Sequence, residues 1–364
     1  MGNPLPGSEA AATGGRITHY FSDAAWIDGR ATAQLAATAG LSGMIAVAGY
    51  PDLHPDRNGP VGAAFLADRL FPALVGNVIG CGMALFTLDL PPRKLSLDKA
   101  ARRLRALEGE WDDTPEARGW GFGTIGGGNH FCEVQAVESL SDAGTALGLS
   151  RDRLCLLVQS GSRGLGESTY RRCEGQPSLD PDRLAGRDYL ADYDRAVEWA
   201  AANRLAIATR AARALNADFQ LVTAAPHNRL VLSVGAWLHR KGAVAATGAS
   251  VPLAGSRDSY SYVLTPIGAA ETPFASLSHG AGRKHDRASM HGRIRKTQSS
   301  LQAQLLTALG GMVLCEDPDL LIEEAGAVYK SAAGVLADLE GLGLAQSIAT
   351  LRPVLTYKKT VEGR

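Results

Sequence analysis

The chain has 364 residues, of which 45% are apolar and 20% are charged, and its 37 basic and 37 acidic residues cancel. This composition is typical of a globular protein with a sizeable core, and zero net charge means that any bound nucleic acid must meet a local basic surface. No apolar run approaches the roughly 20 residues of a membrane-spanning helix, and the start lacks the apolar core of a signal peptide, so we expect no membrane partner.

Taken in chain order, residues 1–15 are predicted to form a flexible N-terminal tail, followed by one domain over 16–364. Short apolar runs bounded by glycine-rich loops predict buried strands at 42–48, 84–90 and 154–158. Apolar residues at helical spacing predict a long helix over 188–217, and further helices are expected near 294–309 and 320–339. The predicted strands cluster before and after the long helix rather than alternating with helices, which favours a mixed α+β domain over a doubly wound sheet.

The cysteines are odd in number and widely scattered: Cys81, Cys132, Cys155, Cys173 and Cys315. Such a distribution argues against a disulfide framework and favours a reducing cytoplasm. A cytoplasmic location is therefore expected.

Five loops hold more glycine and polar residues than packing requires, at 51–54, 79–83, 126–131, 226–228 and 278–283. They contain Cys81, His130 and His227, whose thiolate and neutral imidazole lone pairs suit zinc or manganese. The three residues are too dispersed to match a zinc-finger spacing. Buried side chains with a purely structural role therefore remain the alternative.

Two of the glycine-rich segments could bind phosphate. Backbone N–H groups of 126–128 could cradle an anion, although no Walker motif follows. Arg163, in the stretch 160–164, could clamp a phosphate bidentately, and the alternative is a solvated arginine in a surface turn. His279, flanked by Ser278 and small residues, could attack an electrophile, and the alternative is a loop histidine with structural hydrogen bonds.

The stretch 283–296 contains six Lys or Arg residues and two histidines, with Asp286 as the single opposing charge. A charge run of this kind usually forms a solvated face. Beside a phosphate site it becomes a candidate track for an RNA backbone. It contains no aromatic residue, so base stacking is not indicated there.

Five motifs, in this order, resemble those of the RtcB family of GTP-dependent RNA ligases: IGCGM at 79–83, GGGNHF at 126–131, SGSRGLG at 160–166, HRKGAV at 239–244 and SHGAGR at 278–283. The resemblance extends from about residue 49 to residue 358. PDLHP and PALVGN resemble most the subgroup encoded beside peptide release factor H, which is associated with repair of damaged ribosomal RNA. The resemblance implies a single compact α+β domain with a mixed β-sheet core and peripheral helices.

The resemblance also implies a reaction, in which RNA ends with a 2′,3′-cyclic phosphate or 3′-phosphate are joined to 5′-hydroxyl ends. His279 would attack the α-phosphate of GTP, giving a guanylated histidine and pyrophosphate. The guanylyl group would pass to the RNA 3′-phosphate, and the 5′-hydroxyl would displace GMP. Asp52 resembles the carboxylate that orients or deprotonates this histidine.

Two manganese ions are implied, with Cys81 bridging them, His130 on the first and His227 on the second, to neutralise phosphate charge. The nucleotide pocket would be formed by Asn129, Phe131, Glu133, Asn228, Gly255, Ser256, Ser261, Gly280, Ala281, Gly282 and Lys358. RNA contacts are expected from Arg163, Arg283, Lys284 and Arg287.

Two positions depart from the family pattern. Val78 stands where the family has a metal-binding aspartate, and Gln159 stands where it has a metal-binding histidine. Valine offers no lone pair, and a glutamine carbonyl is a weaker ligand than imidazole. A working ligase is the leading expectation. The alternatives are a catalytically impaired homologue that binds nucleotide or RNA, and another metal-dependent phosphoryl transferase or phosphatase. We expect Cys81, His130, His227 and Gln159 to converge opposite His279.

Overall fold

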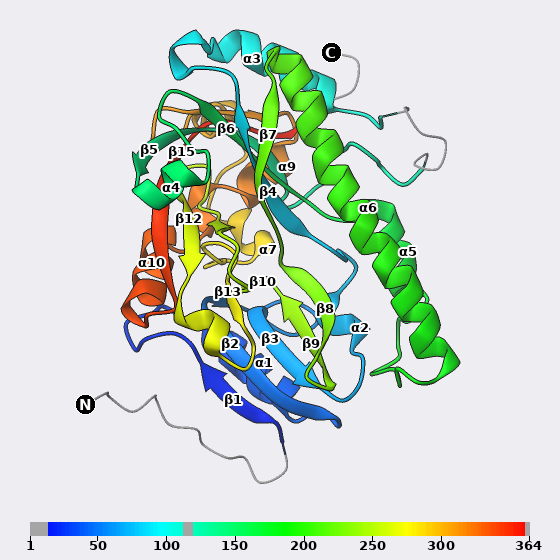
Figure 1. The fold of residues 1–364 in the computed structure, drawn as a ribbon. Coiled ribbons are helices and arrows are strands. Elements are labelled where there is room, and N and C mark those ends of the chain that lie inside the picture. Colours follow the sequence, from blue (N-terminus) through cyan, green and yellow to red (C-terminus); the bar gives the residue numbers. More distant parts are fainter. Residues whose placement is uncertain (1–13, 112–118, 361–364) are drawn as a thin grey trace, which may run out of the picture.

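The computed structural model describes residues 14–111 and 119–360, which form two large β-sheets flanked by helices (Figure 1). The smaller sheet has the strand order β1 (Arg16–His19), β2 (Met44–His54), β3 (Val61–Ala67), β9 (Ala236–Lys241) and β8 (Asn228–Ser233). Strand β1 runs parallel to β2, and the other pairs are antiparallel. The helix α1 (Gly29–Ala39) packs on this sheet, where its Leu35 is fully buried among residues of β2 and β3.

The larger sheet has the order β11 (Val251–Leu253), β12 (Ser261–Pro266), β15 (Ala345–Lys359), β5 (Phe131–Leu140), β6 (Leu154–Ser160), β4 (Gly82–Leu88) and β7 (Phe219–Pro226), and β14 (Met312–Cys315) pairs with β15. Every residue of β4 and β6 is buried, which explains why both strands read as continuous apolar runs. The strands predicted at 42–48, 84–90 and 154–158 are confirmed as β2, β4 and β6 with shifted ends. The predicted mixed α+β architecture is confirmed as well.

The long helix α6 (Leu184–Leu215) runs along the side of both sheets (Figure 1). Its first half buries Tyr193 among residues next to β8 and β9, and its second half buries Ile207 against β4 and β6. Asn216 ends the helix in the left-handed conformation with φ 55°, a common helix terminator. The helix predicted over 188–217 is confirmed and begins earlier than predicted.

The two later helix predictions were wrong in extent. Over 294–309 only α8 (Gln298–Ala303) is helical, and 320–339 is divided between α9 (Pro318–Glu323), a 3-10 turn (Gly326–Val328) and α10 (Ala332–Gly341). Gly326, a poor helix former, lies between α9 and α10, and α10 starts at its own N-cap, where Ser331 Oγ accepts the Gly334 N–H at 3.1 Å. The chain then runs extended so that Tyr329 can form a β-bridge with Arg283.

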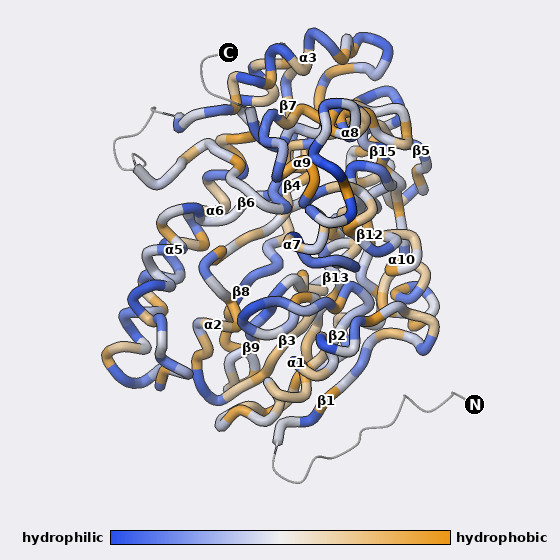
Figure 2. The backbone as a smooth tube through the Cα atoms, turned by 180° about the vertical axis from the view of Figure 1, so that it is seen from behind, coloured by the Kyte–Doolittle hydropathy of each residue, from blue (hydrophilic) through white to orange (hydrophobic). Residues whose placement is uncertain are grey.

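The remaining elements are short: α2 (Pro72–Val75), α3 (Leu97–Leu104), α4 (Asp142–Ala146), α5 (Arg163–Arg171), α7 (Arg287–Met290), and the antiparallel pair β10 (Ala243–Ala245) and β13 (Ser276–Ser278). Figure 2 shows hydrophilic and hydrophobic residues alternating along α3, whose buried residues are Ala100 and Leu104. None of the helices within 14–111 and 119–360 is both long and apolar enough to cross a bilayer. Residues 1–13 of the predicted tail lie outside the described residues, whereas the Gly15 N–H donates to the Ala39 carbonyl at 2.8 Å.

Candidate active site

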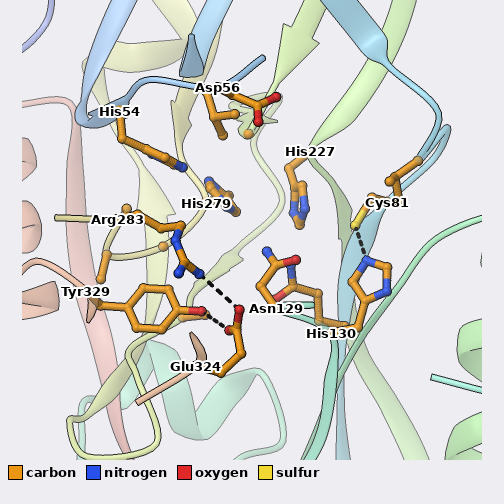
Figure 3. A pocket seen from close by; sticks show the side chains of 18 of the residues that line it. His54, Asp56, Cys81, Asn129, His130, His227, His279, Arg283, Glu324 and Tyr329 are labelled. Carbon is orange, nitrogen blue, oxygen red and sulfur yellow. Dashed lines mark hydrogen bonds and ion pairs between the residues drawn. The ribbon is translucent and has the colours of Figure 1, made fainter. Parts of the chain in front are cut away.

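A cavity of about 400 Å³ lies where strand ends of both large sheets meet (Figure 3). Most of the residues singled out from the sequence line it: Cys81, Asn129, His130, Phe131, Glu133, Gln159, His227, Asn228, Gly255, Ser256, His279, Gly280, Ala281, Gly282, Arg283, Arg287 and Lys358. The four candidate metal ligands therefore line the same cavity as His279. Asp52, Ser261, Arg163 and Lys284 lie outside this lining.

The register of the large sheet brings the candidate ligands together. Gly82 of β4 pairs with Ser160 of β6 on one side and with Pro226 of β7 on the other, so the neighbouring Cys81, Gln159 and His227 reach one edge of the sheet. A Cβ at Gly82 would lie 2.5 Å from the Pro226 Cα, which explains the glycine in this motif. His130 joins them because it precedes β5, whose first residue pairs with Gln159.

The side chains of Cys81 and His130 point at each other. Sγ lies 3.2 Å from Nε2, while His130 Nδ1 lies 3.1 Å from the Ile125 carbonyl oxygen. The carbonyl can only accept, so Nδ1 carries the proton and the Nε2 lone pair faces the thiol. Burial raises the pKa of Cys81 to about 11 and lowers the pKa of His130 to about 3, so both groups are neutral near pH 7 without an ion.

Two other buried polar atoms at this edge have no hydrogen-bond partner among residues 14–111 and 119–360. His227 Nδ1 and Gln159 Nε2 have no hydrogen bond within the described part of the chain, although the two residues are only 2% and 3% exposed. Buried polar atoms without partners cost about 1–3 kcal/mol each, so they indicate a site that a ligand completes. Burial, and then the neighbouring His279, lower the pKa of His227, which keeps its imidazole neutral and able to donate a lone pair.

His279 is held by Asp52, which lies just behind the cavity wall. Nδ1 of His279 is 2.7 Å from Oδ2 of Asp52, and the His279 backbone N–H lies 3.3 Å from the same oxygen. Burial of Asp52 opposes its charge, yet the hydrogen bond and charge of His279 bring the pKa of the carboxyl below its usual value. The ionised Asp52 therefore accepts the Nδ1 proton, which leaves Nε2 as the free nitrogen of an imidazole that lines the cavity.

The far side of the cavity carries Glu133, Phe131 and Lys358. Glu133 accepts a hydrogen bond from Gln135 Nε2 at 2.7 Å, and burial raises its pKa to about 7. Lys358 Nζ lies 3.2 Å from the Gly128 carbonyl and 6.0 Å from the centre of the Phe131 ring. Ser261 supports this wall from behind, because its Oγ accepts the Gly255 N–H at 3.0 Å.

The four arginine and lysine residues predicted to contact RNA are not all together. Arg283 and Arg287 line the cavity, whereas Arg163 lines an adjoining cavity. Lys284 is exposed and points elsewhere, with its Nζ 5.9 Å from the centre of the Trp26 ring. Within the basic stretch 283–296, Arg283 and Arg287 therefore face the cavity, whereas Lys284 faces Trp26.

Sequence reasoning missed Glu324 and Tyr329, which also line the cavity (Figure 3). Glu324 is 2% exposed and pairs with Arg283 at 3.0 Å and with Lys358 at 3.3 Å, and it accepts a hydrogen bond from the Tyr329 hydroxyl. Burial opposes the charge of Glu324, but Lys358 and Arg283 lower its pKa to about 2. The local sequence around Glu324 and Tyr329 has no motif that would indicate a site. The β-bridge between Arg283 and Tyr329 brings this segment to the cavity.

His54 lines the cavity as well, and its ring points toward His279 in Figure 3. Its Nδ1 lies 2.8 Å from the Asp52 carbonyl oxygen, so Nε2 has no proton and can accept one. Burial lowers the pKa of His54 to about 4. The PDLHP segment thus contributes two side chains to the site, of which sequence reasoning assigned a role to Asp52 alone.

The donor set agrees in part with the expected metal ions. Cys81, His130 and His227 provide soft and borderline donors, and the Gln159 amide oxygen adds a hard donor that suits manganese. Across residues 14–111 and 119–360, however, no three His, Cys, Asp or Glu side chains are arranged to hold an ion. Val78 also lines this cavity and offers no side-chain lone pair.

A cavity that combines a histidine–aspartate pair, soft metal donors and buried cations is the kind of site that phosphoryl- and nucleotidyl-transfer enzymes use. The family model described as "tRNA-splicing ligase RtcB" matches residues 112–173 and 178–359. The chain therefore belongs to the RtcB family, a family of RNA ligases.

Individual relatives agree with this assignment. The chain is 42% identical to "RNA-splicing ligase RtcB2" of Escherichia coli (strain ATCC 25922), over 93% of this chain and 94% of that protein. It is 28% identical to "RNA-splicing ligase RtcB1" of the same strain, over 86% and 90% of the two chains. It is 31% identical to "RNA-splicing ligase RtcB" of Mycobacterium bovis, over 65% of each chain. The similarity to RtcB2 thus extends over nearly the whole length of both proteins.

Proposed function

We propose that this RtcB-family protein is a GTP- and manganese-dependent ligase that joins RNA 2′,3′-cyclic phosphate or 3′-phosphate ends to 5′-hydroxyl ends through a guanylated histidine. The observation that carries the proposal is the pair formed by His279 and Asp52. A carboxylate on Nδ1 fixes the tautomer in which Nε2 has a lone pair, and this ring lines a cavity large enough for a nucleotide.

In the first step, Nε2 of His279 attacks the α-phosphorus of GTP, and pyrophosphate leaves. Asp52 stabilises the positive charge that develops on the imidazole. A 2′,3′-cyclic end is first opened by water, which forms the 3′-phosphate and releases the 2′-hydroxyl. In the second step, an oxygen of the RNA 3′-phosphate attacks the guanylyl phosphorus, and the N–P bond breaks. In the third step, the RNA 5′-hydroxyl attacks the activated 3′-phosphate, loses its proton and displaces GMP, which restores the free histidine.

The nucleotide would be held on the wall formed by Asn129, Phe131, Glu133 and Lys358. A carboxylate at Glu133 can accept two N–H groups from guanine, and the Phe131 ring offers a surface for stacking. The loops around Asn228, Gly255, Ser256, Gly280, Ala281 and Gly282 would surround the ribose and phosphates, with Ser261 holding the Gly255 loop. These assignments are supported by the shared cavity and by the family membership.

Manganese would be held by Cys81, His130, Gln159 and His227. When bound, it would supply positive charge that neutralises phosphate oxygens. Val78 offers no donor, so substrate oxygens or solvent would complete the coordination. The unpaired Nδ1 of His227 supports a ligand at this position, and Gln159 would bind through its amide oxygen.

The proposed substrate is RNA with broken ends, and RNA repair in the cytoplasm is the proposed role. The basic residues Arg283 and Arg287 on the cavity wall, with Arg163 and Lys284 beyond it, would contact the RNA phosphates. Similarity to RtcB2 over 93% of the chain is compatible with a specialised member of the family. A functional link to release factor H and to damaged ribosomal RNA belongs to the same proposal.

A second candidate function is a catalytically impaired homologue that binds nucleotide or RNA without joining ends. Val78 and Gln159 favour it, because each replaces a stronger ligand. The intact His279–Asp52 pair favours the ligase, since a hydrogen bond that serves only the reaction has no reason to persist after activity is lost.

The proposal is tested by ligation of two RNA oligonucleotides, of which one ends in a 3′-phosphate and the other begins with a 5′-hydroxyl. We expect a joined product that requires both GTP and manganese, is lost in His279→Ala and is kept in His285→Ala, a matched change of a histidine outside the cavity lining. Binding of GTP and RNA without a product would support the impaired homologue. Phosphate release without joining would indicate a phosphatase or another phosphoryl transferase.

A further inference from the structure

A groove leads away from the candidate active site along α5. A cavity of about 400 Å³ shares Asn77, Val78 and His130 with the active-site lining and extends to Trp120 and Arg163. A further cavity of about 530 Å³ shares Trp120, Gly164 and Glu167 with it and reaches Arg171 and Arg172. The three cavities therefore adjoin one another. We call the two outer ones the α5 groove, defined by Trp120, Arg163, Gly164, Glu167, Arg171 and Arg172.

Trp120 lies where the two cavities of the α5 groove join. It is 36% exposed, a large exposed fraction for a tryptophan that is also fixed in place. The Gly164 N–H donates to the Trp120 carbonyl at 3.2 Å, and a Cβ at Gly164 would lie 3.2 Å from Trp120 Cε3. The glycine thus lets the ring pack closely against the first turn of α5 while the rest of the indole stays open to the groove.

Arg163 stands between Trp120 and the active site. Its backbone is left-handed with φ 53°, which is uncommon for a residue with a long side chain. Its Nε donates to Thr124 Oγ1 at 3.1 Å, and a Cβ at Gly126 would lie 2.3 Å from its Nη1. The guanidinium is therefore positioned against the glycine-rich loop that precedes His130.

Arg171 and Arg172 form the outer end of the α5 groove. They are 69% and 57% exposed, and they pair with Glu167 at 2.5 Å and with Asp192 at 2.6 Å. Exposed ion pairs of this kind contribute little to stability, so a polyanion can displace them. The groove lining holds three arginines and one carboxylate, Glu167.

We propose that the α5 groove binds a single-stranded RNA end on its way to His279, with a base stacked on Trp120 and backbone phosphates on Arg163, Arg171 and Arg172. A basic groove with an exposed aromatic ring is the arrangement that single-strand binders use. The carboxylates of an acidic peptide would contact the arginines alone. The inference rests on the proposed function for the reaction at the inner end. RNA binding itself can be measured separately.

The test is fluorescence anisotropy with a 10-nucleotide RNA that carries a 3′-phosphate. Trp120→Ala is expected to weaken binding by about 5- to 150-fold, the range for loss of one stacked base. Trp120→Phe should keep most of the affinity, because it keeps an aromatic face. Leu232→Ala, which truncates a 63% exposed apolar side chain on β8 outside the groove, should bind as the wild type does.

The arginines are tested through salt dependence. Arg171→Gln and Arg172→Gln should each lower the slope of log affinity against log salt by about 0.7, the value for one phosphate contact on a single strand. Arg183→Gln, in a position 83% exposed and outside the groove, should leave the slope unchanged. Equal slopes for all three variants and the wild type would overturn the phosphate contacts.

Other outcomes separate this inference from the proposed function. Guanylation of His279 by GTP should remain in Trp120→Ala, because the residues proposed to hold the nucleotide (Asn129, Phe131, Glu133 and Lys358) lie outside the α5 groove. Wild-type RNA affinity in Trp120→Ala would overturn the groove and leave the ligase proposal standing. Equal losses in Trp120→Ala and Trp120→Phe would overturn stacking in favour of a structural role. If the wild type forms no guanylated histidine but Trp120→Ala still binds RNA more weakly, RNA binding in the α5 groove is supported and the ligase proposal fails.

Discussion

Nδ1 of His279 lies 2.7 Å from Oδ2 of Asp52, although the two residues are 227 positions apart in the chain. Asp52 belongs to β2 of the smaller sheet, and His279 follows β13, so the contact joins two separate parts of the fold. Asp52 is completely buried, and His279 is the group that keeps its carboxyl ionised. The pair therefore fixes both the charge of one residue and the tautomer of the other.

Asp52→Asn is expected to lower the rate of guanylation by about 100-fold or more, the usual contribution of a positioned acid–base partner. An amide cannot stabilise the charged imidazole, and it can donate to Nδ1 and so favour the wrong tautomer. Quenched-flow measurement of the labelled adduct checks the rate. Asp68→Asn, an exposed aspartate at the end of β3, should react at the wild-type rate. An unchanged rate in Asp52→Asn would show that the contact is only structural.

Val78→Asp is expected to tighten manganese binding by at least about 10-fold, because even outer partners of metal ligands contribute 10- to 100-fold. Val78 lies close to Cys81, whose backbone N–H donates to its carbonyl at 3.1 Å, so a carboxylate there would reach the same ion. Isothermal titration calorimetry measures the affinity. Asn77→Asp adds the same charge one residue away and should give a smaller gain. Equal gains would indicate general electrostatics instead of a ligand position.

Affinity for GTP is expected to rise with pH through about 7. Burial raises the pKa of Glu133 to about 7, so below that pH the carboxyl is protonated and loses its capacity to accept guanine N–H groups. Glu133→Gln should bind GTP more weakly, discriminate less between GTP and ATP, and lose this pH dependence. Titration of a fluorescent GTP analogue from pH 5.5 to 8.5 provides the measurement. The same pH profile in the variant would assign the titration to another group.

Glu324→Gln is expected to destabilise the protein at neutral pH, because it leaves Lys358 and Arg283 without their buried anion. The folded pKa of Glu324 is about 2, below its usual value of 4.5. The stabilisation is therefore complete above about pH 4.5 and is lost as the pH falls toward 2, and a shift of this size corresponds to about 3 kcal/mol. Urea unfolding at several pH values should show the gap between variant and wild type narrowing in acid.

Glu323→Gln is the matched control for that experiment, since the neighbouring carboxylate makes a partly exposed contact with His291 at 3.1 Å. Its unfolding free energy should stay close to that of the wild type at every pH. A constant gap between Glu324→Gln and the wild type across the pH range would contradict the lowered pKa.

The loops of the candidate site could be predicted from the sequence because each contains its own signal. Gly82 is needed for the close approach of β4 to β7, and the Gly126–Gly128 turn has positive φ at its first and third residues. The strands β4 and β6 could also be predicted, because both of their faces are buried and their sequences are therefore largely apolar. Glycines therefore marked these loops in the sequence, although the close approach that Gly82 permits is to Pro226 on a distant strand.

Other parts depend on contacts between distant segments, and no local pattern marks them. In the sequence, Glu324 is one more acidic residue in a predicted helix, whereas in the structure α9 ends at Glu323 and Ala325 is already extended. The bridge between Arg283 and Tyr329 then brings the carboxylate to the cavity. The continuous helix predicted over 320–339 is wrong because the chain leaves the helical conformation between α9 and α10.

Incubation with manganese and GTP labelled at the α-phosphate, followed by denaturing electrophoresis, measures directly whether His279 is guanylated. We expect a labelled, acid-labile band in the wild type and in His285→Ala, and none in His279→Ala. Absence of label in the wild type, with GTP binding detectable and a related ligase labelled in the same conditions, would contradict the guanylated histidine and favour the nucleotide- or RNA-binding homologue.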